Sequence, residues 1–383
     1  KASFQTSTTF RLTILRAINM RSILALLSLK LRLFAHRNIY QTSNLGIIEG
    51  PLPKKVIIHL LQHVGSMCEP AVKVGDEVFT GSKIGTSSNF ISSSVHSSIS
   101  GKVSQIEEML HPVIGKCLSV VIDSDGSDKK DYALGAERDY SKLKKEDILK
   151  IIHDAGIVGL GGAMFPSHVK LMPPADKPID TLILNGAECE PYITCDQALM
   201  SERAKEIIEA LKIIMKLLDV KKAFVAIESN KPHAIRAIKN SAKNLPNVKV
   251  AALRVKYPQG AERQLIKAIL NREVPSGKLP LDVGLVVQNV QTAFSIYEAV
   301  VYSKPLYERV VTFSGGALKK PANVRTRIGT PTKEMVEFLG GLLYEPARVV
   351  FGGPMMGIAQ FTMDVPVIKG TSAVLFLTDK EVF

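Results

Sequence analysis

The sequence has 383 residues, 46% of them hydrophobic, and a formal net charge of +13. A single core rarely grows beyond about 250–300 residues, so the chain is predicted to fold as two or three domains. No apolar run reaches the ~18 residues of a membrane-spanning helix, because Lys30 and Arg32 interrupt the longest one, residues 23–34. Basic residues after position 50 form no stripe with interleaved aromatic residues, so nucleic-acid binding is not predicted.

The first 50 residues form a basic lead, in which seven Lys and Arg residues precede Glu49, the first acid. Its Arg, Ser and Thr content and its amphipathic leucines are typical of a transit peptide or of a basic helix on a membrane surface. A disordered arm, or the cut end of a longer sequence, can have the same composition. The sequence leaves these alternatives open for residues 1–50.

Four cysteines, Cys68, Cys117, Cys189 and Cys195, are too few and too scattered for a disulfide framework, which predicts a reducing compartment. No two of them are spaced as C-x-x-C, so no metal or iron–sulfur site is predicted within this chain. Cys189 and Cys195 are interpreted as structural residues.

A small β module is predicted after Pro51. Its short strands, separated by glycine-containing turns, are expected at residues 54–60, 71–74, 77–79, 102–106 and 119–122. Residues 72–85 and 100–103 resemble the barrel-sandwich fold of biotinyl and lipoyl carriers. Those carriers present a modifiable lysine at a hairpin tip, whereas the corresponding residues 92–98 contain none. A structural or docking role is therefore predicted instead of swinging-arm chemistry.

A glycine-rich loop follows a helix predicted at residues 144–153. Gly156, Gly159, Gly161 and Gly162 lie in it, and Pro166 opens the next segment. The dinucleotide-binding fingerprint needs its glycines directly after a strand, so this loop is of another kind. Glycines without a Cβ let backbone N–H groups approach and hold a phosphate or a flat ring. The alternative is a tight connection between two helices.

From this loop onward, strands and helices alternate, which predicts a largely parallel sheet covered by helices. Strands are expected at residues 181–184, 223–227, 248–255 and 285–288, and helices at 197–218, 233–243, 262–270 and 292–302.

Polar groups follow three of these strands, in residues 185–192, 257–262 and 288–292. One such group would be a common helix cap. Ligands of open parallel sheets bind beyond the carboxyl ends of the strands, so three groups there predict a site for a large, polar, aromatic ligand. Neither a Gly-x-Ser-x-Gly elbow nor a Walker lysine occurs, which favours cofactor chemistry over side-chain chemistry.

The last part of the chain returns to short strands, expected at residues 310–314, 348–351 and 372–377, with a helix at 332–339. Glycine-rich turns separate them, which fits a small β-grasp-like domain. The neighbouring Met355 and Met356 are interpreted as core or turn packing.

Five segments carry a resemblance to the C subunits of Rnf-type ion-translocating electron-transport complexes, relatives of the FMN- and NADH-binding flavoprotein of respiratory complex I. They are residues 156–170, 185–192, 257–265, 286–293 and 351–357. The resemblance covers residues 51–383 and implies an α/β and β multidomain protein. Its parts would be a barrel-sandwich (lipoyl-like) module at 51–128, a Rossmann-like α/β FMN/NADH-binding domain at 140–305 and a β-grasp (SLBB-like) domain at 306–383.

The resemblance also implies FMN as cofactor and NAD(H) as substrate, with hydride exchanged between nicotinamide and FMN and no side chain as catalyst. The residues implied to contact FMN are Gly159, Gly161, Gly162, Ala163, Lys170, Asn185, Glu188, Tyr257, Glu262, Asn289 and Thr292. Phe165 and Glu190 match positions associated with NADH. The complex I relative has an acid at the position of Ala187, so hydrogen bonding there is expected to differ.

The family continues into a cysteine-rich segment that holds two 4Fe-4S clusters, whose ligands are absent from this sequence, so we expect a fragment of a longer subunit. The resemblance implies partner subunits in a membrane complex, indirect exchange with ferredoxin, and a peripheral place on the cytoplasmic face of the inner membrane. An organellar location applies if the basic lead is a transit peptide. A cobalamin-reductase-like flavoprotein and a non-catalytic docking protein are the alternatives.

Overall fold

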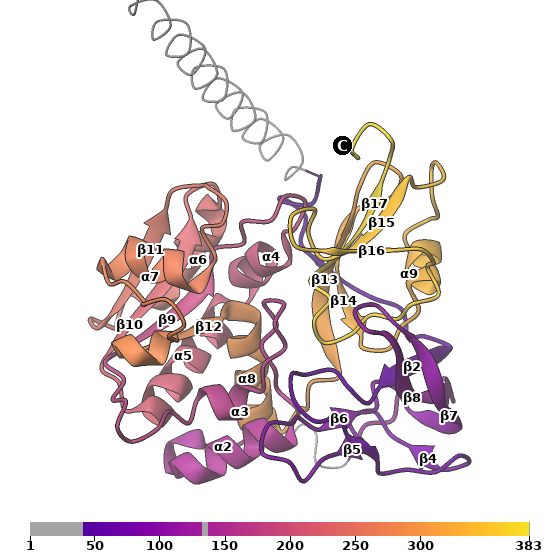
Figure 1. Cartoon of the computed structure of the whole chain (residues 1–383), viewed down its shortest axis with the longest axis horizontal. Coiled ribbons are helices and arrows are strands. Elements are labelled where there is room, and N and C mark those ends of the chain that lie inside the picture. The colour runs from indigo at the N-terminus through magenta and orange to yellow at the C-terminus, as the bar shows by residue number, and fades with distance from the viewer. Residues whose placement is uncertain (1–40, 132–136, 383) are drawn as a thin grey trace, which may run out of the picture.

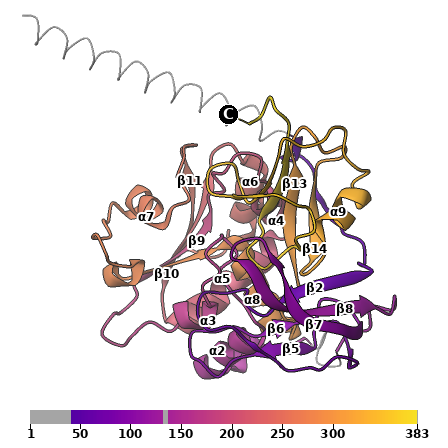
Figure 2. The ribbon, with the colours of Figure 1, turned by 45° about the vertical axis from the view of Figure 1, so that its right-hand side comes forward.

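The computed structural model describes residues 41–131 and 137–382, so most of the basic lead lies outside the described residues. The chain is built from a β module, an α/β domain and a C-terminal sheet domain (Figure 1). Figures 1 and 2 both show the β module below the C-terminal sheet domain, with the α/β domain beside them. None of the helices in the described ranges is both long and apolar enough to cross a membrane.

The β module consists of two antiparallel sheets, in the orders β2-β8-β7-β4 and β3-β5-β6. Its strands are β2 (Lys55–His59), β3 (Glu69–Pro70), β4 (Glu77–Val78), β5 (Lys83–Thr86), β6 (Val95–His96), β7 (Gly101–His111) and β8 (Gly115–Ser124). Val56, Ile58 and Ile122 are fully buried in its core. The strands expected at residues 102–106 and 119–122 lie within β7 and β8, which pair with each other as one long hairpin.

The strand expected at residues 71–74 is wrong. Asp76 closes a turn there: its carboxylate accepts the N–H of Lys73 at 2.8 Å, and its own N–H donates to the Lys73 carbonyl at 3.1 Å. Gly75 within this turn has φ +98°, a conformation that glycine adopts without a steric penalty. The apolar Val72 and Val74 suggested a strand, but the local Asp and Gly chemistry produced a turn.

The α/β domain contains a four-stranded sheet in the order β11-β10-β9-β12, and every neighbouring pair is parallel, which confirms the expected parallel sheet. The strands are β9 (Thr181–Gly186), β10 (Lys222–Glu228), β11 (Val248–Leu253) and β12 (Leu285–Asn289). The helices are α2 (Lys145–Asp154), α3 (Ser167–Lys170), α4 (Cys195–Glu202), α5 (Ala204–Leu218), α6 (Pro232–Ser241), α7 (Glu262–Leu270) and α8 (Val290–Tyr302), with 3-10 turns η2 (Tyr140–Lys142) and η3 (Pro280–Val283).

The single helix expected at residues 197–218 is wrong, because Arg203 divides it into α4 and α5. Arg203 has φ −120° and ψ 33°, outside the helical region. Both pieces contact α6 and α8, but α4 packs mainly on α6 and also contacts the C-terminal sheet, whereas α5 packs mainly on α8. The break therefore lets α4 turn its first residues toward the boundary between the two domains.

The C-terminal domain contains a six-stranded sheet in the order β1-β14-β13-β17-β15-β16, with α9 (Thr332–Phe338) beside it. Its strands are β1 (Ile47–Glu49), β13 (Glu308–Ser314), β14 (Ala322–Arg327), β15 (Arg348–Phe351), β16 (Ile358–Gln360) and β17 (Ala373–Leu377). The sequence pattern did not predict β14 or β16. Phe313, Val324 and Phe376 are buried in its core.

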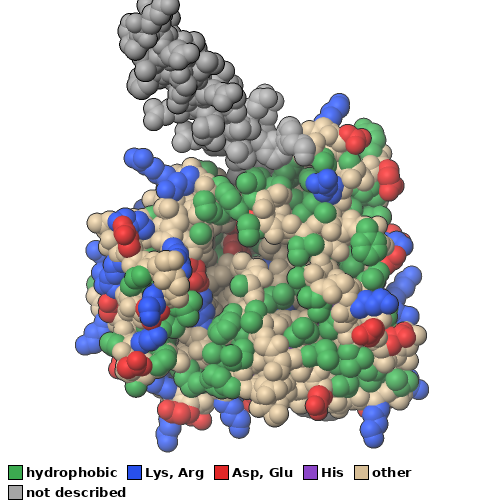
Figure 3. Space-filling model, in the orientation of Figure 1, with side chains coloured by type: hydrophobic (Ala, Val, Ile, Leu, Met, Phe, Trp, Pro, Cys, Tyr) green, Lys and Arg blue, Asp and Glu red, His purple; other side chains and the backbone are tan. Residues whose placement is uncertain are grey.

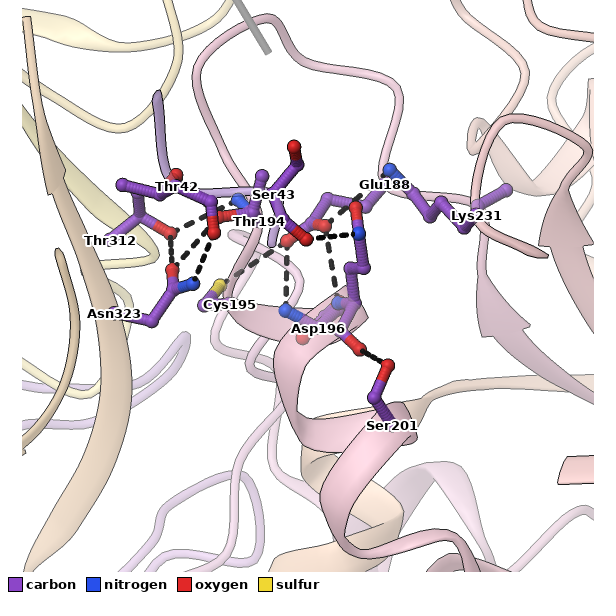
Figure 4. A network of polar contacts seen from close by, with 12 residues as sticks. Thr42, Ser43, Glu188, Thr194, Cys195, Asp196, Ser201, Lys231, Thr312 and Asn323 are labelled. Atoms are coloured by element: carbon purple, nitrogen blue, oxygen red, sulfur yellow. Dashed lines mark hydrogen bonds and ion pairs between the residues drawn. The ribbon is translucent and has the colours of Figure 1, made fainter. Parts of the chain in front are cut away.

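Residues 41–49, which we call the strap, join this sheet from before the β module. Its β1 pairs in parallel with β14. The Thr42 and Thr194 hydroxyls lie 2.6 Å apart, and Gln197 Nε2 donates to the Ser43 carbonyl at 2.6 Å (Figure 4). The strap therefore connects the C-terminal sheet to the start of α4.

A group of buried and half-buried charges connects α8 to the C-terminal sheet. Lys304 Nζ lies 2.6 Å from Glu298 of α8 and 2.7 Å from Glu308 of β13. Arg325 and Arg327 of β14 lie 3.9 and 3.5 Å from Glu308. These ion pairs fix the α/β domain against the C-terminal sheet.

Replacing His111 with Asn is expected to reduce the loss of stability that acid causes. Burial lowers the pKa of His111 to about 4, below its ordinary value of about 6.5. As the pH falls, His111 is protonated in the unfolded chain before it is protonated in the folded one. The free energy of unfolding therefore falls by about 1 kcal/mol between pH 7.5 and 5.5. Urea unfolding at both pH values should show that difference between the wild type and His111→Asn. The exposed His233→Asn is the control, and equal pH dependence in both variants would contradict the prediction.

Candidate functional site

A cavity of about 720 Å³ lies between the α/β domain, the C-terminal sheet domain and the tip of the β7–β8 hairpin. Figure 3 shows the surface hollowed between the first two. It is lined by segments within residues 160–164, 185–196, 257–261, 351–358 and 368–372, together with Pro112, Val113 and Asn289. Its volume is within the range of about 300–1,000 Å³ that is usual for small-molecule sites.

The glycine-rich loop forms one wall of the cavity. Gly159 and Phe165 close it, because the Gly159 N–H donates to the Phe165 carbonyl at 2.9 Å. Among the described residues, the N–H groups of Gly161, Gly162 and Ala163 have no hydrogen-bond partner. Gly162 has φ +114°, and a Cβ there would meet nothing within 4 Å. The open donors of Gly161 and Gly162 line the cavity and form a cradle for an electron-rich or anionic group.

Asn185, at the end of β9, fixes the opposite wall. Its Nδ2 donates to the Gly260 carbonyl at 2.9 Å, and its Oδ1 accepts the N–H of Ala187 at 3.1 Å. A Cβ on Gly260 would lie 2.3 Å from the Ala187 carbonyl oxygen, so only glycine allows this approach of the two loops. Alanine offers no carboxylate at position 187, and Asn185 takes both partners from the backbone of these loops.

Glu188 caps helix α4 from the wall of the cavity. Its carboxylate accepts the N–H groups of Asp196 at 2.8 Å and Gln197 at 3.3 Å, a favourable place for an anion at a helix N-terminus. Asp196 accepts in turn from Asn289 Nδ2 at 2.7 Å. Glu188, Cys195 and Asp196 bring ligand-type atoms within 4.8 Å of one another. Burial raises the pKa of the Cys195 thiol, so we assign this group to helix capping.

Glu190 connects the α/β domain to the C-terminal sheet domain. It accepts the N–H of Met355 at 3.0 Å and the Tyr257 hydroxyl at 3.5 Å. Burial raises the pKa of its carboxyl group. A Cβ on Gly353 would lie 2.1 Å from Glu190 Oε2, so this glycine makes room for the carboxylate.

The structure brings part of the expected site together around the cavity. The expected residues that line it are Gly161, Gly162, Asn185, Glu188, Glu190, Tyr257 and Asn289. Those outside the lining are Gly159, Ala163, Phe165, Lys170, Glu262 and Thr292. Thr292 supports the glycine-rich loop from behind by accepting the Leu160 N–H at 2.8 Å, and Lys170 forms an ion pair with Glu262 at 2.5 Å.

Sequence reasoning missed other residues of the site. Cys189, Cys195 and Asp196 line the cavity, as does Met356, which is 77% exposed and not part of a core. Met355 and Met356 lie in a turn, as one of the two interpretations had it. The turn at the end of β10, residues 228–231, lies at the same sheet edge as the three polar groups, behind residues that line the cavity. Its place at the end of a parallel strand was the sequence signal that could have found it.

The fold and the site define a class: an α/β domain of the FMN-binding type with a β module before it and a β-grasp domain after it. Family models match the same three parts. The Nuo51 FMN-binding domain matches residues 152–298, the RnfC barrel sandwich hybrid domain 34–127, and the SLBB domain 310–359. The chain belongs to the RnfC family, the C subunits of ion-translocating oxidoreductase complexes. The resemblance and the fold class expected from the sequence are confirmed.

Three relatives illustrate the similarity, each of them the C subunit of its complex. The chain is 49% identical over 341 residues to that of the proton-translocating ferredoxin:NAD(+) oxidoreductase complex of Clostridium ljungdahlii, covering 89% of this chain and 74% of that protein. It is 47% identical to that of the Na(+)-translocating ferredoxin:NAD(+) oxidoreductase complex of Acetobacterium woodii, covering 86% and 74%. The C subunit of the ion-translocating oxidoreductase complex of Rhodobacter capsulatus is 42% identical, and the match covers 89% of this chain and 66% of that protein.

A solved structure shares the fold. The NAD+-reducing [NiFe]-hydrogenase in its H2-reduced state superposes with a TM-score of 0.52 at 20% sequence identity, covering 62% of this chain and 47% of that chain. At this identity the similarity concerns the fold alone.

Proposed function

We propose that the chain is an FMN-binding electron-transfer subunit of an ion-translocating ferredoxin:NAD+ oxidoreductase complex. The observation that carries this proposal is the glycine-rich loop, in which the open N–H groups of Gly161 and Gly162 line the cavity within the part matched by an FMN-binding domain. FMN, when bound, supplies a ring that exchanges hydride with nicotinamide. The chain's own residues hold and orient the two rings and exclude water, which is what hydride transfer requires of a protein.

The residues at the cavity fit FMN by chemistry and space. Gly161, Gly162 and Ala163 provide N–H donors without side chains large enough to block a ring. Asn185, Glu188, Tyr257 and Asn289 provide amide, carboxylate and hydroxyl groups at the ends of the loops. Gly159 and Thr292 hold the glycine-rich loop in place. Lys170 and Glu262, joined as an ion pair, are proposed to serve the phosphate end of the cofactor.

The NADH site is proposed at the Glu190 side of the cavity, where the α/β and β-grasp domains meet. Glu190 would orient the nicotinamide nucleotide. Phe165, which follows the cavity-lining Met164 but does not line the cavity itself, is proposed to contact the adenine. Cys189 lies between Glu188 and Glu190 in the sequence and lines the cavity, and burial raises the pKa of its thiol. These assignments place hydride donor and acceptor in one cavity.

The rest of the electron path is proposed from the relatives. The names of the C. ljungdahlii and A. woodii proteins state ferredoxin and NAD+ as the redox partners of their complexes. We propose that electrons pass between FMN and ferredoxin through two 4Fe-4S clusters and further subunits. We also propose that the protein lies peripherally on the cytoplasmic face of the membrane that holds the complex.

An absorbance spectrum tests the proposed function. The protein is incubated with FMN, desalted, and then mixed with NADH without oxygen. Retained flavin bands that bleach with NADH are the expected result. A protein that retains no flavin would contradict the proposal and favour the docking alternative.

Replacing Glu190 with Gln is expected to leave FMN bound but slow its bleaching by NADH at least about tenfold. The amide keeps the side chain's shape but removes the charge, and a lost charged hydrogen bond costs about 1.5–3 kcal/mol. Stopped-flow absorbance at several NADH concentrations measures this, with the exposed Glu345→Gln as control. Bleaching at the wild-type rate would remove Glu190 from the NADH site.

A further inference from the structure

The turn at the end of β10, residues 228–231, contains several buried polar groups. Glu228 and Lys231 are each 1% exposed. Among the described residues, Glu228 Oε1, Asn230 Oδ1 and Lys231 Nζ have no hydrogen-bond partner, and neither has Gln259 Oε1 in the neighbouring loop. Buried polar groups without partners are rare in proteins, so a cluster of them calls for an explanation.

Lys231 lies against Glu188, whose carboxylate lines the cavity. Lys231 Nζ is 3.7 Å from Glu188 Oε2 (Figure 4). The same carboxylate caps α4 through the N–H groups of Asp196 and Gln197, and Asp196 holds Asn289 on the cavity wall. One buried cation therefore contacts the group that fixes α4 and, through α4, a second residue of the cavity.

Lys231 offsets part of the buried negative charge of this region. Glu188, Asp196 and Glu228 are three buried carboxyl groups, and Lys231 and Arg309 are the cations that interact with them. Arg309 interacts with Cys195 and Asp196, whereas Lys231 interacts with Glu188 and Glu228. Burial raises the pKa of Glu228 to about 7, and Lys231 opposes that rise. Removing one partner of a buried ion pair leaves the other uncompensated.

We propose that Lys231 is a positioning residue of the cavity and that Glu228 balances its charge. The Lys231 ammonium holds the Glu188 carboxylate against the first turn of α4, so that Asp196 and Asn289 keep their places. Lys231 acts through Glu188 and does not line the cavity itself. The inference rests on the proposed function only where FMN binding is the readout.

Hydrogen exchange tests the positioning role without any ligand. In Lys231→Met, the N–H groups of Asp196 and Gln197 are expected to exchange about tenfold faster, because Glu188 no longer caps them firmly. Glu228→Gln/Lys231→Met removes one negative and one positive charge, so the net charge of the region equals that of wild type, and exchange is expected within about threefold of wild type. Lys231→Arg keeps the cation, so its exchange is also expected within about threefold of wild type. Lys239→Met, an exposed change on the same helix α6, is the control.

Flavin fluorescence gives the second readout. The dissociation constant for FMN is expected to rise about tenfold in Lys231→Met and to return to within about threefold of wild type when Glu228→Gln is added. Unchanged exchange in Lys231→Met, or no rescue by Glu228→Gln, would overturn the positioning role. If Lys231→Met fails to fold, folding of the double variant supports the charge balance, whereas failure of both overturns it.

The two proposals fail in different ways. If the wild-type chain binds no FMN, the proposed function fails, and hydrogen exchange at Asp196 and Gln197 decides the role of Lys231 alone. If wild type binds FMN but the exchange rates of Asp196 and Gln197 do not change in Lys231→Met, the proposed function is supported and the positioning role of Lys231 is wrong.

Discussion

Gly161→Val is expected to weaken FMN binding at least about 100-fold while the protein stays folded. A Cβ on Gly161 would lie 3.5 Å from Asn289 Cβ, an ordinary van der Waals contact, so the protein itself accepts the side chain. The valine would nevertheless occupy the cradle formed by the open N–H groups of the glycine-rich loop. The side chain blocks the ligand from those donors and overlaps with it, which together removes about 2.7 kcal/mol or more of binding energy.

Isothermal titration with FMN measures the effect, and the thermal unfolding temperature checks that the variant folds. Ala252→Val, on the exposed side of strand β11, is the control for adding a branched side chain. If Gly161→Val binds FMN as tightly as wild type, the glycine-rich loop does not hold the cofactor.

Lys304→Met is expected to lower the free energy of unfolding by on the order of 3 kcal/mol, the usual cost of leaving a buried ion pair without one partner. Lys304 is 18% exposed and lies within 2.7 Å of both Glu298 and Glu308. Burial alone would lower the pKa of Lys304, but the two glutamates raise it above its ordinary value, so the side chain is fully charged. Its removal leaves Glu298 without this cation.

The chain offers a matched control at its surface. Lys333 and Asp364 also approach to 2.6 Å, but their side chains are 57% and 56% exposed. Exposed pairs contribute about 0–1 kcal/mol, so Lys333→Met should change the free energy of unfolding very little. Urea unfolding measures the free energy of unfolding of Lys304→Met and Lys333→Met relative to wild type. Equal losses would mean that burial does not set the value of the Lys304 ion pairs.

The α/β domain was the part of the fold that the sequence predicted best. The helix expected at residues 262–270 and, outside that domain, the strand expected at 348–351 match α7 and β15 residue for residue. Hydrophobic periodicity is strong where one face of a helix or a whole strand is buried. Most other elements that were expected begin or end within a few residues of their predicted positions, because caps and frayed ends decide the boundaries.

The missed elements depend on contacts between distant segments. Strand β14 reads Ala-Asn-Val-Arg-Thr-Arg, and its polar Asn323 and Thr326 are buried; Asn323 bonds to Thr42, Thr194 and Thr312. A buried polar strand has no apolar pattern to detect. The break at Arg203 likewise depends on the partners of α4 and α5, which local sequence does not state.

The site was predicted in part for the same reason. Residues at the ends of parallel strands can be placed from topology, and this placed Asn185, Glu188 and Asn289 at one edge. The cavity is closed by residues 351–358 of the β-grasp domain and by the tip of the β7–β8 hairpin, where Gln360 Nε2 donates to the Pro112 carbonyl at 2.8 Å. Those contacts join separate domains, so no spacing within one segment announces them.

The strap affects the order in which the chain folds during synthesis. Glu49 and its ion-pair partner Arg325 are 276 residues apart, so β1 waits for β14 to leave the ribosome. At about 5–20 residues per second, that delay is roughly 14 to 55 s. During this interval the strap is an unpaired strand with exposed backbone donors and acceptors, a state that attracts chaperones or aggregates. The long sequence separation of this contact also slows folding, so the strap is expected to join last.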